Sequence, residues 1–201
     1  MFASCARLCR LFRRDRRGAA AVEFGLIAAP VIFTLLAAVE GGFDLYNRNV
    51  LDNATQEVAR QIMTGAIQSM TINNQPINAT QFRTNVVCPL LPSVFSCNNV
   101  IVNVKTFTEA AYPGGFYNFV NSRQSSLTLP PLDNSQTSYC IGATGAYVLL
   151  QILYPLPLVT NVFAPGTVTS FNGRKVRLLF SNAAFKNEPF PAGSYVPPTG
   201  C

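Results

Sequence analysis

The stretch Arg16-Arg17-Gly18-Ala19-Ala20-Ala21-Val22-Glu23-Phe24 determines how this chain is organised. A basic segment precedes it, and residues 24–39 follow it without a single charge. A carboxylate costs about 2.5–3.5 kcal/mol at the centre of a bilayer and less near its surface, so such an acid normally has a function. Glu23 is the fifth residue after Gly18, and Phe24 follows it directly. Glu23 is therefore a candidate functional residue. The other candidates lie at the start of the segment or directly beside Glu23: Gly18, Ala19 and Phe24.

The basic charge is concentrated at the start of the chain. Of the fifteen Lys and Arg residues, six lie within residues 1–18, and the remainder of the chain has nine basic against eight acidic residues. Positive residues beside a first hydrophobic segment are retained in the cytoplasm. We expect residues 1–18 to be a cytoplasmic leader. Nucleic-acid binding would need basic residues clustered on a folded domain, and Arg174, Lys175 and Arg177 are the only such cluster. No nucleic-acid partner is expected.

The apolar segment is long enough to cross a bilayer. As a helix with a rise of 1.5 Å per residue, residues 19–39 extend about 31 Å. Pro30 removes one helical hydrogen bond, which membrane helices tolerate as a local kink. We predict a transmembrane helix over residues 19–42, with the chain beyond it outside the cytoplasm.

A second helical pattern follows directly. Apolar residues recur every three or four positions, as expected for an amphipathic helix. They are Tyr46, Val50, Leu51, Ala54, Val58, Ala59 and Ile62. Residues 43–67 are therefore predicted to continue the helix outward, with this stripe against the core of an exported domain.

Residues 68–201 are predicted to form that exported domain. Three segments rich in β-branched and aromatic residues indicate strands: residues 100–107, 145–154 and 174–185. The second is expected to end at Pro155 and Pro157. The predicted fold class is α+β: a long N-terminal transmembrane and amphipathic helix followed by a small antiparallel β-sheet domain.

Shorter features lie between these elements. Residues 73–76 form a turn cluster, and residues 78–87 are compatible with a short helix that has Thr80 as its N-cap. Residues 108–139 are polar and long for a loop, so they are either mobile or a binding excursion.

The six cysteines divide between the two sides of the membrane. Cys5 and Cys9 lie in the leader, whereas Cys88, Cys97, Cys140 and Cys201 are exported, where disulfides form. Four cysteines allow three pairings. We favour Cys88 with Cys97 as a local loop and Cys140 with Cys201. Metal binding is the weaker reading, because the chain has no C-x-x-C pair and no histidine, and no cofactor is expected.

Catalysis is not expected. Without histidine, Ser/His/Asp and Cys/His arrangements are excluded. A carboxylate pair drawn from Glu109, Asp133 and Glu188 is conceivable, but nothing in their spacing supports it. We expect neither an enzyme nor a small-molecule substrate.

The chain is better read as the substrate of a peptidase. Gly18 has no side chain, so its backbone can be approached closely at the membrane surface. A signal peptidase would instead cut after the apolar run, where Val39-Glu40-Gly41 is a poor small-x-small site. An uncleaved anchor also remains open.

Residues 17–30 resemble the opening of TadE-like proteins, minor pseudopilins of the tight-adherence (Flp) pilus assembly system. The resemblance continues through Glu40, Tyr46, Asn53-Ala54 and Ala59-Arg60, and weakens after about residue 65. Residues 185–190, with their Asn-Glu-Pro-Phe ending, resemble the end of many members. Gly25 stands where the family often has alanine, and residues 108–139 have no evident counterpart.

The resemblance implies a cut by a prepilin peptidase between Gly18 and Ala19. It also implies that Glu23 pairs with the freed amine, its own or that of a neighbour, which would bring subunits into one register. The alternative is that Glu23 reaches back to Arg16 or Arg17. The protein would be a single-pass component of the bacterial inner membrane with a periplasmic C-terminal domain, and pilin and other assembly proteins would be its partners.

Two other classes of protein remain as alternatives. One is an unprocessed, membrane-tethered periplasmic binding module that contacts a ligand through residues 108–139. The other is a weak envelope enzyme. Loss of assembly on Glu23→Gln substitution would favour the pseudopilin-like component over the tethered module.

Overall fold

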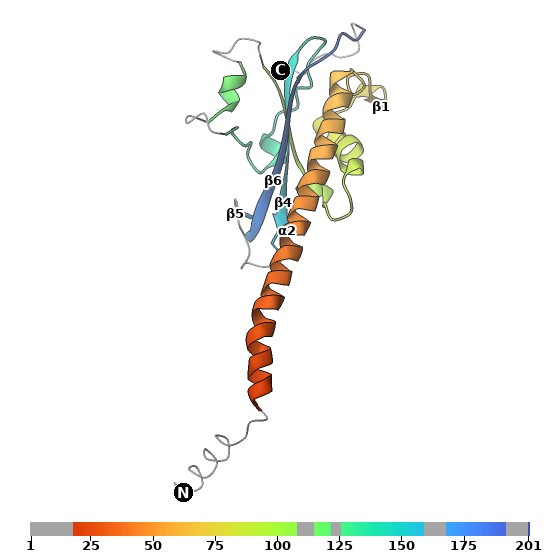
Figure 1. Ribbon diagram of the computed structural model, residues 1–201. Helices are drawn as coiled ribbons and strands as arrows, with labels where there is room; N and C mark the ends of the chain where they lie inside the picture. Colours follow the sequence, from red (N-terminus) through yellow and green to blue (C-terminus); the bar gives the residue numbers. More distant parts are fainter. Residues whose placement is uncertain (1–17, 108–114, 122–125, 159–167, 192–200) are drawn as a thin grey trace, which may run out of the picture. The chain divides into compact units, whose positions relative to one another are not determined.

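The computed structural model describes residues 18–107, 115–121, 126–158, 168–191 and 201. The chain divides into two compact units, the first ending at Asp44 and the second beginning at Leu45. A long apolar helix, α2, is followed by antiparallel sheets (Figure 1). The predicted α+β fold class is confirmed.

Helix α2 runs without interruption over Ala19–Met63 and contains Pro30. In the second unit, its Leu45–Met63 half buries most of the predicted apolar stripe: Leu51, Ala54, Val58, Ala59 and Ile62. Tyr46 was expected on this stripe but is 56% exposed. The single helix predicted from the two sequence patterns is therefore present, and its buried stripe begins later than expected.

Helix α2 ends at Met63, earlier than the expected boundary near residue 67, and the residues that follow explain why. Gly65 has φ +81°. The Gly65 amide donates to the carbonyl of Ile62 (3.1 Å), and the Ala66 amide donates to that of Gln61 (3.0 Å). This is the Schellman pattern of helix termination, in which a glycine takes the left-handed position. A Cβ on Gly65 would also lie 2.6 Å from the Phe190 ring, so only glycine fits here.

The main sheet has four antiparallel strands in the order β3-β4-β6-β5. Their bounds are Ile101–Phe107 for β3, Tyr147–Pro157 for β4, Val168–Phe171 for β5 and Arg174–Lys186 for β6. The three predicted strands correspond to β3, β4 and β6. Strand β5 was not predicted, although the Asn172-Gly173 turn that joins it to β6 has φ +49° and +74°, which is typical of a tight hairpin.

Strand β4 continues through Pro155 and Pro157, where the sequence had predicted its end. The pairing of β4 with β3 ends at Leu153. The Asn187 amide donates to the carbonyl of Ala146 (2.9 Å), so even-numbered β4 residues direct their backbone groups toward β6 and odd-numbered ones toward the β3 side. The missing N–H groups of Pro155 and Pro157 would therefore have pointed toward the β3 side, beyond the end of β3. No strand hydrogen bond is lost there, and such edge positions tolerate proline.

Along the chain, a small hairpin lies between α2 and the main sheet. Strands β1 (Thr71–Ile72) and β2 (Gln75–Pro76) pair antiparallel. The residues between them, Asn73 and Asn74, have φ +53° and +59°. Asparagine tolerates the left-handed conformation of such turns. The turn predicted at residues 73–76 is confirmed.

The predicted short helix is present but has a different cap. Helix α3 covers Ala79–Phe82, and a π-helical turn, Arg83–Val87, continues it. The Asn78 side chain accepts from the Gln81 amide (2.9 Å), and the Gln81 side chain accepts from the Asn78 amide (3.0 Å). This reciprocal capping box makes Asn78 the N-cap, and the expectation of Thr80 was wrong.

Part of the long polar segment lies along the outer edge of β3. The Val102 amide donates to Oδ1 of Asn134 (3.2 Å), and the Val104 amide donates to the carbonyl of Ser138 (2.9 Å). The Cys140 amide in turn donates to the carbonyl of Val104 (2.9 Å). Residues 134–140 therefore cover this edge of the sheet.

Two disulfides join the four cysteines of the second unit. One links Cys88 to Cys97, and the other links Cys140 to Cys201, with Cα–Cα distances of 5.7 and 5.5 Å. These are the pairs that the sequence favoured.

Candidate membrane-anchoring and processing segment

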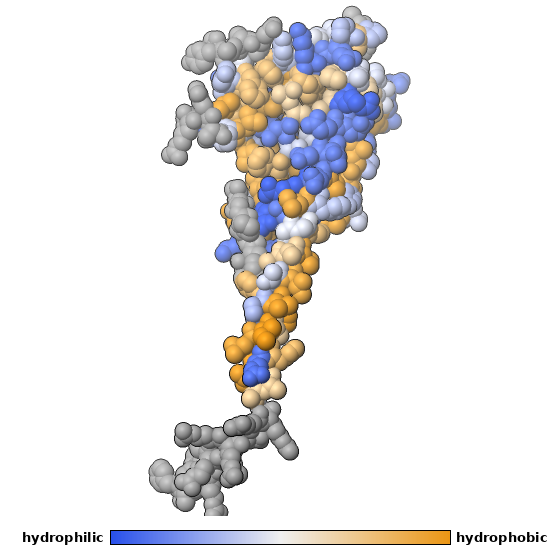
Figure 2. Space-filling model, in the orientation of Figure 1, coloured by the Kyte–Doolittle hydropathy of each residue, from blue (hydrophilic) through white to orange (hydrophobic). Residues whose placement is uncertain are grey.

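The first half of α2 presents apolar side chains to its surroundings. Ten large apolar residues between Val22 and Val39 are each 51–74% exposed. They are Val22, Phe24, Leu26, Ile27, Val31, Ile32, Phe33, Leu35, Leu36 and Val39. Figure 2 shows this apolar surface along the lower part of the helix. Soluble monomers rarely expose apolar patches of more than a few hundred Å².

By length and composition, α2 can cross a membrane, and its most apolar window is not buried within the protein. Pro30 lies inside this window and does not end the helix. The hydroxyl of Thr34 donates to the Pro30 carbonyl (2.8 Å), so this polar side chain has a hydrogen-bond partner within the helix. A polar side chain that is satisfied within its own helix is compatible with a lipid environment.

Gly18 lies directly before the helix, and Ala19 is the first helical residue. A Cβ added to Gly18 would meet no atom within 4 Å. Packing within the described part of the chain therefore does not require glycine at this position. The peptide bond between Gly18 and Ala19 joins two exposed residues.

Glu23 lies four residues after Ala19, which places the two on the same face of α2, one turn apart. Both residues are exposed, and Phe24 is 74% exposed. The alternative partners of Glu23, Arg16 and Arg17, lie outside the described residues. The carboxylate is therefore presented on an apolar helix surface, next to the position where a cut after Gly18 would leave an amine.

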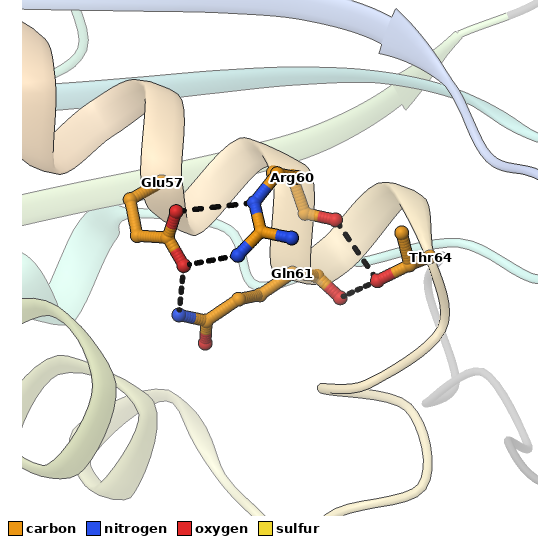
Figure 3. A network of polar contacts seen from close by, with 4 residues as sticks. All are labelled: Glu57, Arg60, Gln61 and Thr64. Atoms are coloured by element: carbon orange, nitrogen blue, oxygen red, sulfur yellow. Dashed lines mark hydrogen bonds and ion pairs between the residues drawn. The ribbon is translucent and has the colours of Figure 1, made fainter.

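The opposite end of α2 carries a polar network (Figure 3). Arg60 donates to both oxygens of Glu57 (2.9 and 3.1 Å), and Gln61 donates to Oε1 of Glu57 (3.0 Å). The hydroxyl of Thr64 donates to the Arg60 carbonyl (3.0 Å). The hydrogen bond from Arg60, and then that from Gln61, lowers the pKa of Glu57, and the same bond raises the pKa of Arg60.

The acids considered for catalysis have other contacts. Asp133 Oδ1 accepts from the backbone amide of Ser135 (2.8 Å), which lowers the pKa of Asp133. The backbone of Glu188 bonds the end of α2, since its amide donates to the Met63 carbonyl (2.8 Å). Glu109 lies outside the described residues. Within the described ranges, no group of three His, Cys, Asp or Glu side chains could hold a metal ion.

The Asn-Glu-Pro-Phe segment has a structural role that the sequence did not predict. The Asn187 side chain is 2% exposed and donates to the carbonyls of Ile141 and Ala143 (both 3.0 Å). Phe190 covers Gly65 at the end of α2. The segment therefore fixes the helix end to the sheet. An asparagine directly after a long apolar strand was the signal that could have indicated it.

One exposed apolar helix before an α+β unit has the properties of a single-pass membrane anchor. Residues 18–60 match the model of the family described as TadE-like protein. This confirms the resemblance seen in the sequence, and the match contains Gly18, Ala19, Glu23 and Phe24. Neither the curated proteins nor the solved structures contain a match to the chain. The family match and the apolar helix together fit a membrane protein associated with Tad pili.

Proposed function

We propose that this chain is a pseudopilin-like component of Tad-type pilus assembly or secretion, acting through protein contacts. A prepilin peptidase cuts it between Gly18 and Ala19 and leaves the apolar helix on the product. The basic leader is cytoplasmic, the helix lies in the bacterial inner membrane, and the disulfide-bonded unit is periplasmic. Pilin and other assembly proteins are its partners.

The observation that carries this proposal is the placement of Glu23. The carboxylate lies on an exposed apolar helix, one turn after the residue that would become the new N-terminus. A free amine and a carboxylate attract strongly where the dielectric constant is low, and either one alone is costly to bury. Pairing between Glu23 and such an amine supports assembly in a fixed register.

Mass spectrometry of the N-terminus, on protein purified from native membranes, tests the proposal. A chain that starts at Ala19 is the expected result. A chain that starts at Met1 would favour the tethered periplasmic module, and a start near Gly42 would mean a released periplasmic protein. Either of the last two results contradicts the proposed processing.

We further propose that the protein has no catalytic activity and takes no small-molecule substrate or cofactor. This rests on the complete lack of histidine and on the capping contact made by Asp133. A substrate-dependent effect of replacing Glu109, Asp133 or Glu188 would contradict it.

A further inference from the structure

Among the described residues, the outer edge of strand β6 has no neighbouring strand over most of its length. Strand β5 pairs only with Arg174–Arg177, whereas β6 continues to Lys186. On its other side, β6 pairs with β4 over Val176–Lys186. Within the described residues, Leu178–Lys186 therefore has one paired and one open side. We call the open side the β6 edge.

The direction of the backbone groups follows from the register. Asn187 exchanges two backbone hydrogen bonds with residues 145–146, on the β4 side (2.9 and 3.2 Å). Backbone groups alternate sides along a strand, so those of Phe180, Asn182 and Ala184 point away from β4. In the part of the chain that the structure describes, these outward amides and carbonyls have no backbone partner. Phe180 is 47% exposed and Ala184 is exposed, so the edge is accessible.

The opposite edge of the same sheet, at β3, is covered by hydrogen-bonded residues. At β3, the outward amides of Val102 and Val104 bond to Asn134 and Ser138, as described above. An open strand edge is a template for pairing with another chain, and proteins usually cover it or interrupt it with proline or charge. Leu178–Phe185 contains neither proline nor a charged residue.

A groove runs beside the β6 edge within the second unit. Its volume is about 310 Å³. Helix α2 supplies one wall and β6 the other: Gln56, Ala59, Arg60 and Met63 face Asn182, Ala183, Ala184 and Phe185. Figure 1 shows β6 running beside this half of α2. The alanines on both walls leave room for the side chains of an added strand, whose backbone would bond the β6 edge.

The charged residues of β6 itself have one sign. Strand β6 contains no acidic residue, and Arg174, Lys175 and Lys186 are exposed near its two ends. On the helix wall, the Arg60 side chain is 65% exposed, and its charge is paired with that of Glu57. Acidic residues at the ends of an incoming segment would complement these charges and direct its approach.

We propose that the β6 edge binds an extended segment of another exported protein, which adds to the sheet as a further strand. The segment has small or apolar residues at its centre and acidic residues at its ends. Main-chain hydrogen bonds supply affinity in this mode, and alternate side chains supply specificity. The inference rests on the proposed function for the presence of assembly partners outside the membrane.

A second copy of this chain is the less suitable occupant. Two β6 edges could pair about a two-fold axis at Asn182, but the strands would then run in opposite directions. Strand β6 runs alongside α2, from Arg174 toward the end of the helix at Met63 (Figure 1). Two chains inserted through the same membrane helix share one orientation, which disfavours this pairing.

The test is photo-crosslinking of the full chain in cells that assemble the pilus. Benzoylphenylalanine replaces Gln56 on the groove wall, and Asn53, also exposed on α2, provides the control position. Ala184→Pro removes one outward amide and leaves the pairing with β4 intact, as an edge position allows. Ser170→Pro is the matched control, because it removes an outward amide from β5, outside the groove.

We expect a covalent adduct at position 56 with another exported protein, mapped by mass spectrometry to an extended segment with acidic ends. Ala184→Pro should lower the adduct yield about tenfold, as expected for one hydrogen bond lost and its partner left unpaired. Ser170→Pro should not lower it. If Ala184→Pro does not fold, Ala184→Glu keeps the amide and should reduce the yield by repelling the acidic segment.

The proposal is overturned by the absence of an adduct, by an adduct that joins two copies of this chain, or by equal effects of the two prolines. The same samples report their N-terminus. A chain that starts at Ala19 but gives no adduct means that the surface is wrong while the proposed function stands. An adduct on a chain that starts at Met1 means that the surface is right and that the proposed function is wrong.

Discussion

At the scale of single residues, Glu23 carries the functional argument. Its carboxylate lies at the head of a surface made of apolar side chains, on the same helical face as Ala19. A group of this kind is tolerated only near the membrane surface or with a partner of opposite charge. The amine released by a cut after Gly18 would be such a partner.

Replacement of Glu23 by glutamine tests this role. Glu23→Gln keeps the shape but removes the charge, so an amine buried beside it would lose its partner. We expect the chain still to start at Ala19 and pilus output to fall at least about tenfold, because breaking a buried pair costs several kcal/mol. The measurements are N-terminal mass and pilus yield. Asp52→Asn, which also removes one carboxylate from an exposed position of the same helix, is the control. Normal pilus yield from Glu23→Gln would refute the role.

The Glu57–Arg60 pair gives a pH prediction at the same scale. The pKa of Glu57 is lowered in the folded protein, chiefly by the hydrogen bond from Arg60. The pair therefore stabilises the fold above the ordinary pKa of glutamate, and this stabilisation is lost as the pH falls through the lowered value. Because both groups are exposed, the effect should be small.

Chemical unfolding of the purified chain between pH 7 and pH 3 measures this dependence. Glu57→Gln should reduce the loss of stability on acidification. The pKa of Asp133 is also lowered, chiefly by the hydrogen bond from the Ser135 amide, so its stabilisation is likewise lost on acidification. Asp133→Asn therefore serves as the comparison, and the double variant should show the sum of both effects. An unchanged pH profile for Glu57→Gln would contradict the assignment.

At the scale of elements, the end of α2 depends on Gly65 for two separate reasons. Its positive φ disfavours any other residue by about 1–2 kcal/mol. The Phe190 ring also occupies the space of a Cβ, and overpacking of this kind costs about 1–3 kcal/mol. Gly173 has φ +74° but nothing within 4 Å of its added Cβ, so it reports the first cost alone.

Gly65→Ala should therefore lower the free energy of unfolding by more than Gly173→Ala. We expect losses of about 2–5 kcal/mol and about 1–2 kcal/mol respectively. Urea unfolding of the two variants measures the difference. Equal losses would mean that Phe190 moves aside without cost and that its contact with Gly65 does not help to fix the helix end.

The same elements show what the sequence could and could not predict. Helix α2 was predictable because an uncharged apolar run over residues 24–39 leads into a stripe of apolar residues with helical period. Strand β5 was missed although Asn172-Gly173 is a strong hairpin signal, because its four residues carry little apolar pattern of their own. The prolines of β4 were expected to end the strand. Whether the strand tolerates them depends on where β3 ends, and only the tertiary structure gives that information. For the candidate site, Gly18 and Glu23 could be proposed from the sequence and remain predictions, whereas the role of Asn187 required knowledge of which carbonyls approach it.

At the scale of the whole molecule, the two disulfides constrain the unfolded chain to different extents. Cys88–Cys97 closes a loop with a sequence separation of 9, whereas Cys140–Cys201 spans 61. In the chain-entropy account, the shorter loop stabilises the fold by about 2.6 kcal/mol and the longer one by about 4.3 kcal/mol. The longer bridge should therefore contribute more.

Paired alanine substitutions test this ranking. Replacing Cys140 and Cys201 together should lower the free energy of unfolding by about 1.7 kcal/mol more than replacing Cys88 and Cys97 together. The measurement is urea unfolding without reductant, and the fully reduced parent chain provides the lower limit. The opposite order would show that strain or residual structure, rather than loop length, controls the contribution of the bridges.

The division at Asp44/Leu45 makes a prediction about the whole chain. The large apolar side chains that are half exposed or more lie almost entirely before residue 47, whereas the second unit holds the sheet, both disulfides and the buried half of α2. A fragment of residues 45–201, oxidised in the periplasm, should fold and remain soluble without detergent. Size-exclusion chromatography and the amide spectrum of the fragment measure this, with the full chain as the control that requires detergent. An aggregated or unfolded fragment would mean that the first half of α2 is needed to complete the core, and that the boundary at Asp44 does not separate an anchor from an independently folding unit.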